Sequence, residues 1–379
     1  MRRHVHLVVP GPLDQRTGGY VYDRRIGDGL RVLGRTVVVH ELAGAFPAAD
    51  ETARQAAAFA VELMLPHPHP ALPHRGGGGQ AGAPRHLSLP PCGGGPGWGV
   101  PLIDGLALPA FEHLAERLPR PWIALVHHPL ALETGLSDQE ASRLAALERR
   151  LLAGAERIVV TSPQTRRDLE VYEVSPDRVG VVLPGTERAA LARGSGGPGC
   201  AMLCVASLTP RKGHLVLLEA LGRLVDLDWR LTCVGSAERD PACAHAIREA
   251  IRGLELRQRI RLVGEHEEAA LGPFYDAADL FVLASRHEGY GMVLADALAR
   301  GLPVVSTTAG AIPDTVPPSA GLLVRPGDAG ALAAALRRAI AGPELRARLA
   351  EGAREAREHL PGWADAAHAF AAELDRVAG

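Results

Sequence analysis

The chain has 379 residues, 47% of them hydrophobic, which is enough to form the cores of two domains of ordinary size. Its 41 Lys and Arg residues nearly balance 43 Asp and Glu residues, so the overall charge gives no reason to expect nucleic acid as a partner. No apolar run approaches the length of a membrane span, and no two of the five cysteines have C-x-x-C spacing. We therefore expect a cytoplasmic protein with reduced thiols.

Short apolar runs alternate with helical patterns through the first half of the chain. The runs cover residues 4–11, 35–42, 100–108, 122–128, 157–162 and 178–185, and a helical pattern covers 137–153. Uninterrupted apolar strands that alternate with helices favour a parallel sheet covered on both faces. Residues 66–99 are rich in Pro, Gly and His and cannot bury a core, so we interpret them as a flexible insertion. The sequence predicts a Rossmann-like domain over residues 1–190.

The same alternation is clearer in the second half. Predicted strands cover 201–207, 229–235, 259–264, 280–285, 303–307 and 320–326, and predicted helices begin at 214 and cover 242–252, 267–278 and 292–299. We expect a glycine-rich linker over 191–199, a second Rossmann-like domain over 200–357 and a terminal helical segment over 358–379. Ligands of such sheets bind outside the carboxyl ends of the strands, so the cleft between two facing sheets is the expected site.

The stretch RHEGYGMVLADALARGLPVV places Glu288 directly after a predicted strand and before a helix that begins near Met292. Gly289 and Gly291 permit a tight turn and a close approach of the backbone. The first amides of the helix favour an anion, and Asp296 lies one turn further on. Two carboxylates beside an anion site suit a ligand with hydroxyls on both sides of a phosphate, such as a nucleotide sugar. The alternative is that Glu288 caps the helix and Asp296 is solvated.

Three further motifs follow predicted strands. SLTPRKGH places Arg211 and Lys212 at the start of a helix, where two cations suit a diphosphate, although solvated basic turns are common. TGGY carries Gly18 and Gly19 after the first strand. His127 and His128 end another strand, and since neighbouring strand residues face opposite sides, at most one of them is expected in the cleft.

At these motifs the chain resembles the family 4 glycosyltransferases, which have the GT-B fold. The resemblance is specific in the second domain, through PRKGH, EGYGMVLADALARGLPVV and AGLLVRPGD, and weaker in the first, through TGGY, His127 and PGTE. It implies an α/β protein with two Rossmann-like domains facing across a cleft, and transfer of a sugar with retention of configuration and without a required metal. The terminal segment resembles the family helix that crosses back to the first domain.

The resemblance also implies roles for single residues. Glu288 would contact the donor sugar, Lys212 the diphosphate, and His127, more than His128, the donor from the first domain. Two residues depart from the family pattern: Asp296 stands where Glu usually contacts the ribose, and Ser207 stands where many members have Arg, so Arg211 is expected to replace the missing cation. The expected catalytic residues are Glu288, His127 and Lys212, the expected donor-binding residues are Gly18, Gly19, Ser207, Arg211, Lys212, Glu265, Gly289, Tyr290, Gly291, Met292 and Asp296, and no metal ligand is expected.

No first-domain carboxylate stands out as a nucleophile in the sequence. We therefore expect attack on the front face, with the departing diphosphate accepting the proton of the acceptor and positive groups stabilising its charge. No cofactor is expected beyond a UDP-, GDP- or ADP-sugar as substrate. The acceptor is not identified, and a lipid acceptor would bring contact with a membrane surface. An epimerase, a phosphorylase and a catalytically silent binding protein remain as alternatives.

Overall fold

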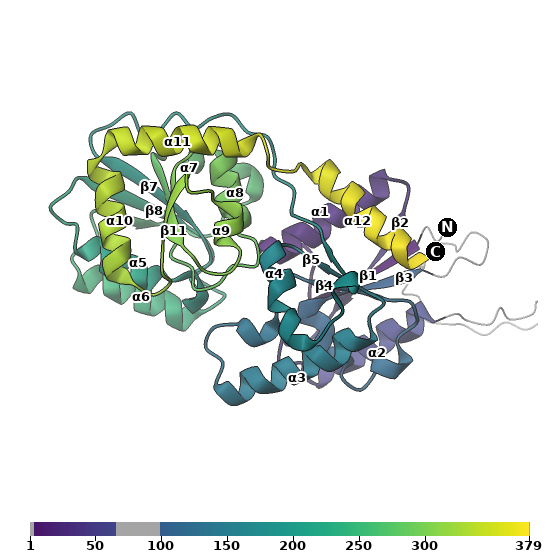
Figure 1. Cartoon of the computed structure of the whole chain (residues 1–379). Helices are drawn as coiled ribbons and strands as arrows, with labels where there is room; N and C mark the ends of the chain where they lie inside the picture. The colour runs from purple at the N-terminus through teal and green to yellow at the C-terminus, as the bar shows by residue number, and fades with distance from the viewer. Residues whose placement is uncertain (1–3, 66–98, 379) are drawn as a thin grey trace, which may run out of the picture.

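A computed structural model describes residues 4–65 and 99–378 as two α/β domains (Figure 1). The strands of these residues form two six-stranded sheets, and every strand pairing in them is parallel. This confirms the two parallel sheets predicted from the uninterrupted apolar strands. The predicted insertion at 66–99 lies outside the described residues, apart from Gly99.

The first sheet has the strand order β2-β1-β3-β4-β5-β6. Its strands are β1 (His4–Pro10), β2 (Thr36–Leu42), β3 (Val100–Asp104), β4 (Ile123–Val126), β5 (Arg157–Val160) and β6 (Val179–Val181). Its helices are α1 (Gly18–Val32), α2 (Glu51–Met64), α3 (Asp138–Gly154) and α4 (Pro163–Asp168). The order of the strands reverses between β1 and β3, so the switch point of the sheet lies there, where ligands of open α/β sheets bind.

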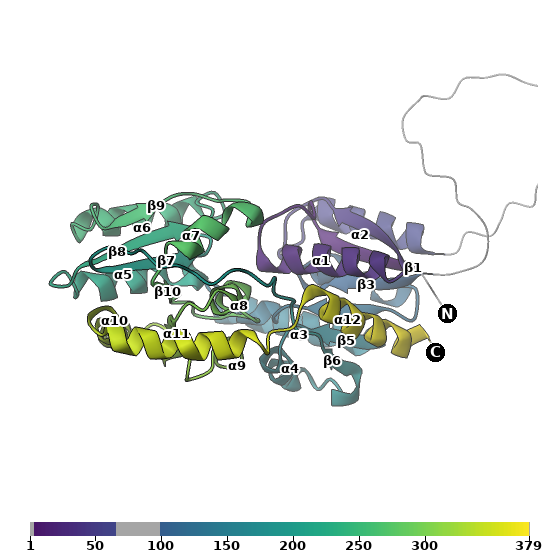
Figure 2. The same cartoon turned by 90° about the horizontal axis from the view of Figure 1, so that it is seen from above.

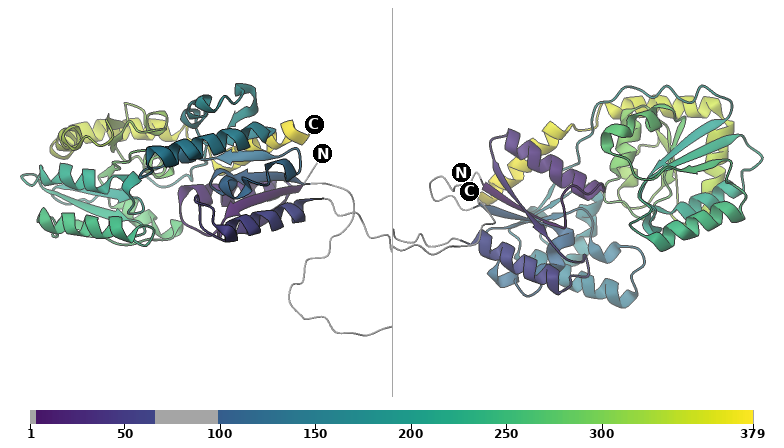
Figure 3. Two further views of the ribbon diagram at one scale, coloured as in Figure 1. Left: turned by 90° about the horizontal axis from the view of Figure 1, so that it is seen from below. Right: turned by 180° about the vertical axis from the view of Figure 1, so that it is seen from behind.

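Alternating side chains of the first sheet enter two separate cores. Leu7 and Leu125 pack with α1 on one face, whereas Val8 and Val126 pack with α2 and α3 on the other. Figure 3, in its left panel, shows α2 and α3 on the face turned to the viewer. Because both faces are covered, the central strands are apolar on both faces, as in IALV of β4, which explains the continuous runs in the sequence.

The second sheet has the strand order β12-β11-β10-β7-β8-β9. Its strands are β7 (Cys200–Val205), β8 (Trp229–Val234), β9 (Ile260–Leu262), β10 (Leu280–Val282), β11 (Val304–Thr307) and β12 (Gly321–Val324). Its helices are α5 (His214–Gly222), α6 (Pro241–Gly253), α7 (Gly272–Asp276), α8 (Met292–Ala299), α9 (Ile312–Thr315), α10 (Ala329–Ala341) and α11 (Pro343–Arg357). This is the dinucleotide-binding order, with its switch point between β7 and β10.

The last helix, α12 (Trp363–Ala378), leaves the second domain and packs beside α1 of the first (Figures 1 and 2). Phe370 and Leu374 of α12 enter the same core as α1. The chain therefore crosses between the domains twice, and the crossings contact each other, since the backbone N–H of Thr186 donates to the carbonyl of Pro361 at 2.8 Å.

Two predicted elements differ from the structure. The predicted strand 100–108 ends at Asp104, because the Asp104 carboxylate accepts a hydrogen bond from the Leu106 N–H at 2.6 Å and caps the 3-10 helix η1 (Gly105–Phe111). The predicted helix 267–278 is divided into a 3-10 turn, η7 (Glu268–Ala270), and α7, because Pro273 has no N–H to continue a helix. Within residues 4–65 and 99–378, no helix is both long and apolar enough to cross a bilayer.

Candidate functional site

The loops that follow β7 and β10 meet at the switch point of the second sheet. The first carries Arg211 and Lys212, in the 3-10 turn η6 (Pro210–Lys212), and the second carries Glu288. They contact each other directly, since the backbone N–H of Arg286 donates to the carbonyl of Arg211 at 2.7 Å. Gly291 at φ 88° leads into α8, which begins at Met292 as predicted. The fold thus brings the two strongest sequence motifs together.

Lys212 and Glu288 form a buried ion pair. The Lys212 Nζ lies 2.6 Å from the Glu288 Oε1, and the Ser285 hydroxyl donates to the same oxygen at 2.6 Å. Glu288 is only 6% exposed, and burial opposes its ionisation, but Lys212, Arg211 and Ser285 together hold the pKa of its carboxyl at about 2. Burial lowers the pKa of Lys212, and Glu288 opposes that shift. The pair places a fixed cation and a fixed anion at the switch point.

The guanidinium of Arg211 is engaged at the domain boundary. It contacts Glu133 of the first domain at 3.2 Å, donates to the carbonyl of His287 at 3.1 Å and lies 3.7 Å from Glu288. Glu133 also contacts the Nε2 of His128 at 3.3 Å, and burial opposes its ionisation, but His128 and Arg211 lower the pKa of Glu133 to about 2. Arg211 therefore connects the loop after β7 of the second domain to the loop after β4 of the first.

The two domains are in close backbone contact where Gly289 meets His127. A Cβ at position 289 would overlap the carbonyl oxygen of His127, so only glycine permits this approach. Thr165, in α4, lies within 3.3 Å of the carbonyl oxygens of both residues. Gly18, at the start of α1, faces the start of α8, where a Cβ would lie 3.5 Å from the Met292 sulfur. Predicted site residues from the two domains are thus adjacent.

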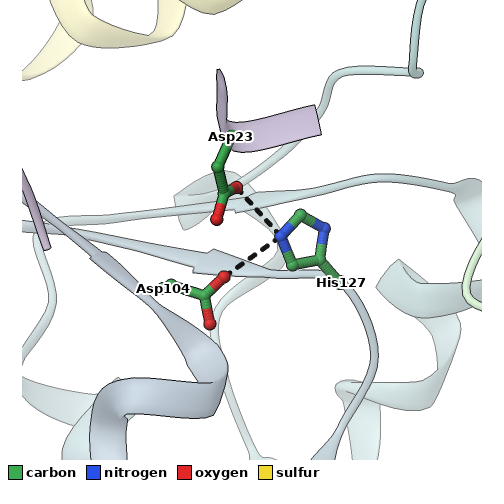
Figure 4. Close-up of side chains that lie close together, drawn as sticks. All are labelled: Asp23, Asp104 and His127. Atoms are coloured by element: carbon green, nitrogen blue, oxygen red, sulfur yellow. Dashed lines mark hydrogen bonds and ion pairs between the residues drawn. The ribbon is translucent and has the colours of Figure 1, made fainter. Parts of the chain in front are cut away.

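His127 follows β4 and its ring is held by two buried carboxylates (Figure 4). Its Nε2 lies 3.0 Å from Asp23 Oδ1, on α1, and 3.2 Å from Asp104 Oδ2, at the end of β3. Burial opposes the charge of His127, but Asp23 and Asp104 raise its pKa to about 10. Among the described residues this is the group whose ligand atoms, all within 4.8 Å of one another, could accept a divalent cation.

The remaining predicted site residues lie on several different elements of the second domain. Asp296 lies on α8, and burial raises the pKa of its carboxyl to about 6. Tyr290 is 8% exposed, and its carbonyl accepts the Thr315 hydroxyl at 2.7 Å. Ser207 follows β7 and is half-buried. Glu265 is exposed and follows β9, the edge strand, so the fold places it two strands from β7.

Sequence reasoning missed Asp23, Asp104 and Glu133. Asp104 lies within the predicted strand 100–108, although a carboxylate that follows an apolar run can indicate the ligand-binding end of a strand. Asp23 lies in a polar helix that also carries Asp28, and nothing in the local pattern distinguishes a buried carboxylate from a solvated one.

Two family models match the chain. The model described as "Glycosyltransferase Family 4" matches residues 98–189, and that described as "Glycosyl transferases group 1" matches residues 199–342. The chain belongs to glycosyltransferase family 4. The resemblance seen in the motifs is therefore confirmed.

Curated relatives of this family 4 member are named D-inositol 3-phosphate glycosyltransferase. That of Thermomonospora curvata is 30% identical over 281 residues, which cover 68% of this chain and 62% of the relative. That of Xylanimonas cellulosilytica is 30% identical over 279 residues, covering 68% and 66%. The chain thus spans less than two thirds of the length of these relatives.

Solved structures of similar fold confirm the GT-B architecture. Sucrose-phosphate synthase from Thermosynechococcus elongatus has a TM-score of 0.79 at 21% identity, with 99% of each chain covered. Anabaena HepE in complex with UDP and glucose has a TM-score of 0.70 at 15% identity, covering 98% of this chain and 99% of HepE. At these identities the likeness shows the shared fold.

Proposed function

We propose that this family 4 member transfers a sugar from a nucleoside diphosphate donor to the hydroxyl of an acceptor. The observation that carries the proposal is the buried Lys212–Glu288 pair at the switch point of the second sheet. Stability alone does not explain a buried ion pair, because apolar residues in place of both partners are often as stable, although removal of one partner alone is costly. Its position at the ligand-binding edge of a dinucleotide-type sheet favours a functional role.

In this proposal Lys212 binds the diphosphate. Its ammonium has three hydrogens, one of which is directed at Glu288, so phosphate oxygens can accept the others. Arg211 is held 3.7 Å from Glu288 and adds positive charge to the same loop. These cations stabilise the negative charge that develops on the departing diphosphate.

Glu288 then binds hydroxyls of the donor sugar. Its carboxylate stays ionised at neutral pH, and Ser285 and Lys212 fix its position, so it accepts hydrogen bonds without reorganisation. His127 faces the donor from the first domain. The acceptor hydroxyl attacks the face from which the diphosphate departs, a leaving phosphate oxygen takes its proton, and configuration is retained. No metal at the diphosphate is part of the proposal, because Lys212 and Arg211 supply positive charge there.

We infer a UDP-sugar as the first donor to test, because HepE, which shares the fold, is described in complex with UDP and UDP-glucose. D-inositol 3-phosphate is the first acceptor to test, because the curated relatives carry that name.

The test begins with a thermal-shift screen of the full chain against UDP-, GDP- and ADP-sugars, since a ligand that binds the folded state raises its melting temperature. Release of nucleoside diphosphate is then measured with and without the acceptor, in the presence of EDTA, and the anomeric configuration of the product is read by NMR. Acceptor-dependent release is expected. Binding without release over a broad panel of acceptors would indicate a binding protein and contradict the proposal.

A further inference from the structure

The carboxylates behind His127 are buried more deeply than the histidine itself. Asp23 is 1% exposed and Asp104 is 4% exposed, whereas the side chain of His127 is 19% exposed. Both carboxylates contact the same ring atom, Nε2. Figure 4 shows Nδ1 on the opposite side of the ring, turned away from both carboxylates.

The charges of this buried group are only partly compensated. Asp23 Oδ2 is buried and has no hydrogen-bond partner among the described residues. Two ionised carboxylates and a neutral imidazole would leave two uncompensated charges in the interior, which is costly. A second proton on the imidazole compensates one of these charges. Burial and Asp104 raise the pKa of Asp23 to about 7, so at pH 8 both carboxylates are anions beside the ring.

We propose that Asp23 and Asp104 are positioning residues that hold His127 by Nε2 as a doubly protonated ring and present its Nδ1–H to the donor. This inference rests on the proposed function, in which His127 faces the donor. A neutral imidazole could carry its proton on Nε2 and leave Nδ1 as an acceptor. The two carboxylates at Nε2 require a hydrogen on that nitrogen. Nδ1 is then a donor as well only if the ring carries a second proton and is charged.

The surroundings of His127 support a fixed ring. Titratable groups face it from two elements: Asp23 and Tyr22 from α1, and Asp104 from the end of β3. The ring of Tyr22 meets that of His127 edge-on at 5.4 Å between centroids. A Cβ at Gly19 would lie 3.3 Å from the His127 ring, so the helix start also packs against it. No partner for Nδ1 occurs among residues 4–65 and 99–378, and this hydrogen remains for a ligand oxygen.

The experiment compares Asp23→Asn and Asp104→Asn with wild type and with His127→Ala. Asp28→Asn is the matched control, because Asp28 lies on the same helix but its side chain is 62% exposed. Loss of a charge-assisted hydrogen bond to His127 is expected to lower kcat by roughly tenfold to a hundredfold. Affinity for the nucleoside diphosphate, measured by calorimetry, should stay within about twofold, since the second domain supplies that contact. The control should keep wild-type kcat.

A second measurement reports the ring itself. In ¹⁵N-histidine-labelled protein, the His127 signal is identified by its absence from His127→Ala. We expect both ring nitrogens to be protonated at pH 8 in wild type, and deprotonation to move below pH 8 in each Asp variant. A singly protonated ring at pH 8 in wild type would overturn the inference, even if a variant fails to fold.

Two other results would also overturn it. Wild-type kcat in both Asp variants would show that the carboxylates only pack, and one equivalent of a divalent metal in the purified protein would show that they are ligands instead. If no nucleotide sugar is turned over at all, the proposed function fails, while the NMR result still decides the state of His127.

Discussion

Glu288→Gln is the substitution that tests the ion pair at the switch point. The carboxyl pKa of Glu288 lies at about 2 instead of the usual 4.5, and each pKa unit corresponds to about 1.4 kcal/mol. The ionised form therefore stabilises the folded state by about 3 kcal/mol at neutral pH. Because the folded pKa is lowered, this stability is present above about pH 4.5 and is lost as the pH falls through about 2. Gln removes it and leaves the Lys212 ammonium buried without its anion.

The expected loss of about 3 kcal/mol corresponds to a melting temperature roughly 6–12 °C lower, at about 2–4 °C per kcal/mol for a domain of this size. Scanning calorimetry at pH 7 measures it. Glu219→Gln is the matched control, because Glu219 pairs with Arg223 on the surface of α5 at 61% exposure, and surface pairs contribute little. Lys212→Met combined with Glu288→Gln should recover part of the loss, with a coupling of about 1–3 kcal/mol.

Turnover of the same variant tests the proposed role of Glu288. Gln keeps the shape of the side chain but not its charge, so turnover should fall about a hundredfold while Lys212 still binds the diphosphate. A melting temperature within about 2 °C of wild type, or strictly additive effects of the two substitutions, would refute the ion-pair reasoning. Wild-type turnover would remove Glu288 from the site.

Arg211→Ala should weaken nucleoside diphosphate binding by roughly tenfold or more, and Ser207→Arg should strengthen it if a cation position stands empty. Calorimetry measures both affinities. Unchanged affinity in Arg211→Ala would leave Lys212 and the backbone amides as the diphosphate ligands. Gly289→Ala should lower turnover by roughly tenfold or more without unfolding either domain, because its Cβ overlaps the carbonyl of His127. The radius of gyration measured by small-angle scattering should increase as the domains separate. A compact, active variant would contradict the contact. Asp296→Asn should raise the melting temperature at pH 8 but not at pH 4, because burial raises the pKa of Asp296 to about 6 and its ionised form, populated above that pH, destabilises the folded state. Equal stabilisation at both pH values would show that its charge is not the cause.

The sequence by itself determined the second domain and much of its site. Helix α8 begins at Met292 because Gly291 and the apolar pattern after it are local signals, and the strands are visible because both faces of each sheet are covered. Lys212 and Glu288 could be placed at one sheet edge because both follow strands, and the carboxyl ends of parallel strands lie on the same side. Motif, periodicity and this topological rule are all readable along the chain.

The tertiary structure alone decided which of these groups touch. That Lys212 pairs with Glu288, that Arg211 reaches Glu133 in the other domain, and that Gly289 lies against His127 are contacts between residues far apart in sequence.

Asp23 and Asp104 make the same point for buried charge. An aspartate in a polar helix and one inside an apolar run have no local feature that shows they face a common histidine. Their burial follows from the packing of α1 on the sheet, and their effect on His127 from distances of 3.0 and 3.2 Å. Electrostatic coupling depends on separation in space and on exclusion of water, and neither quantity is a property of the sequence order.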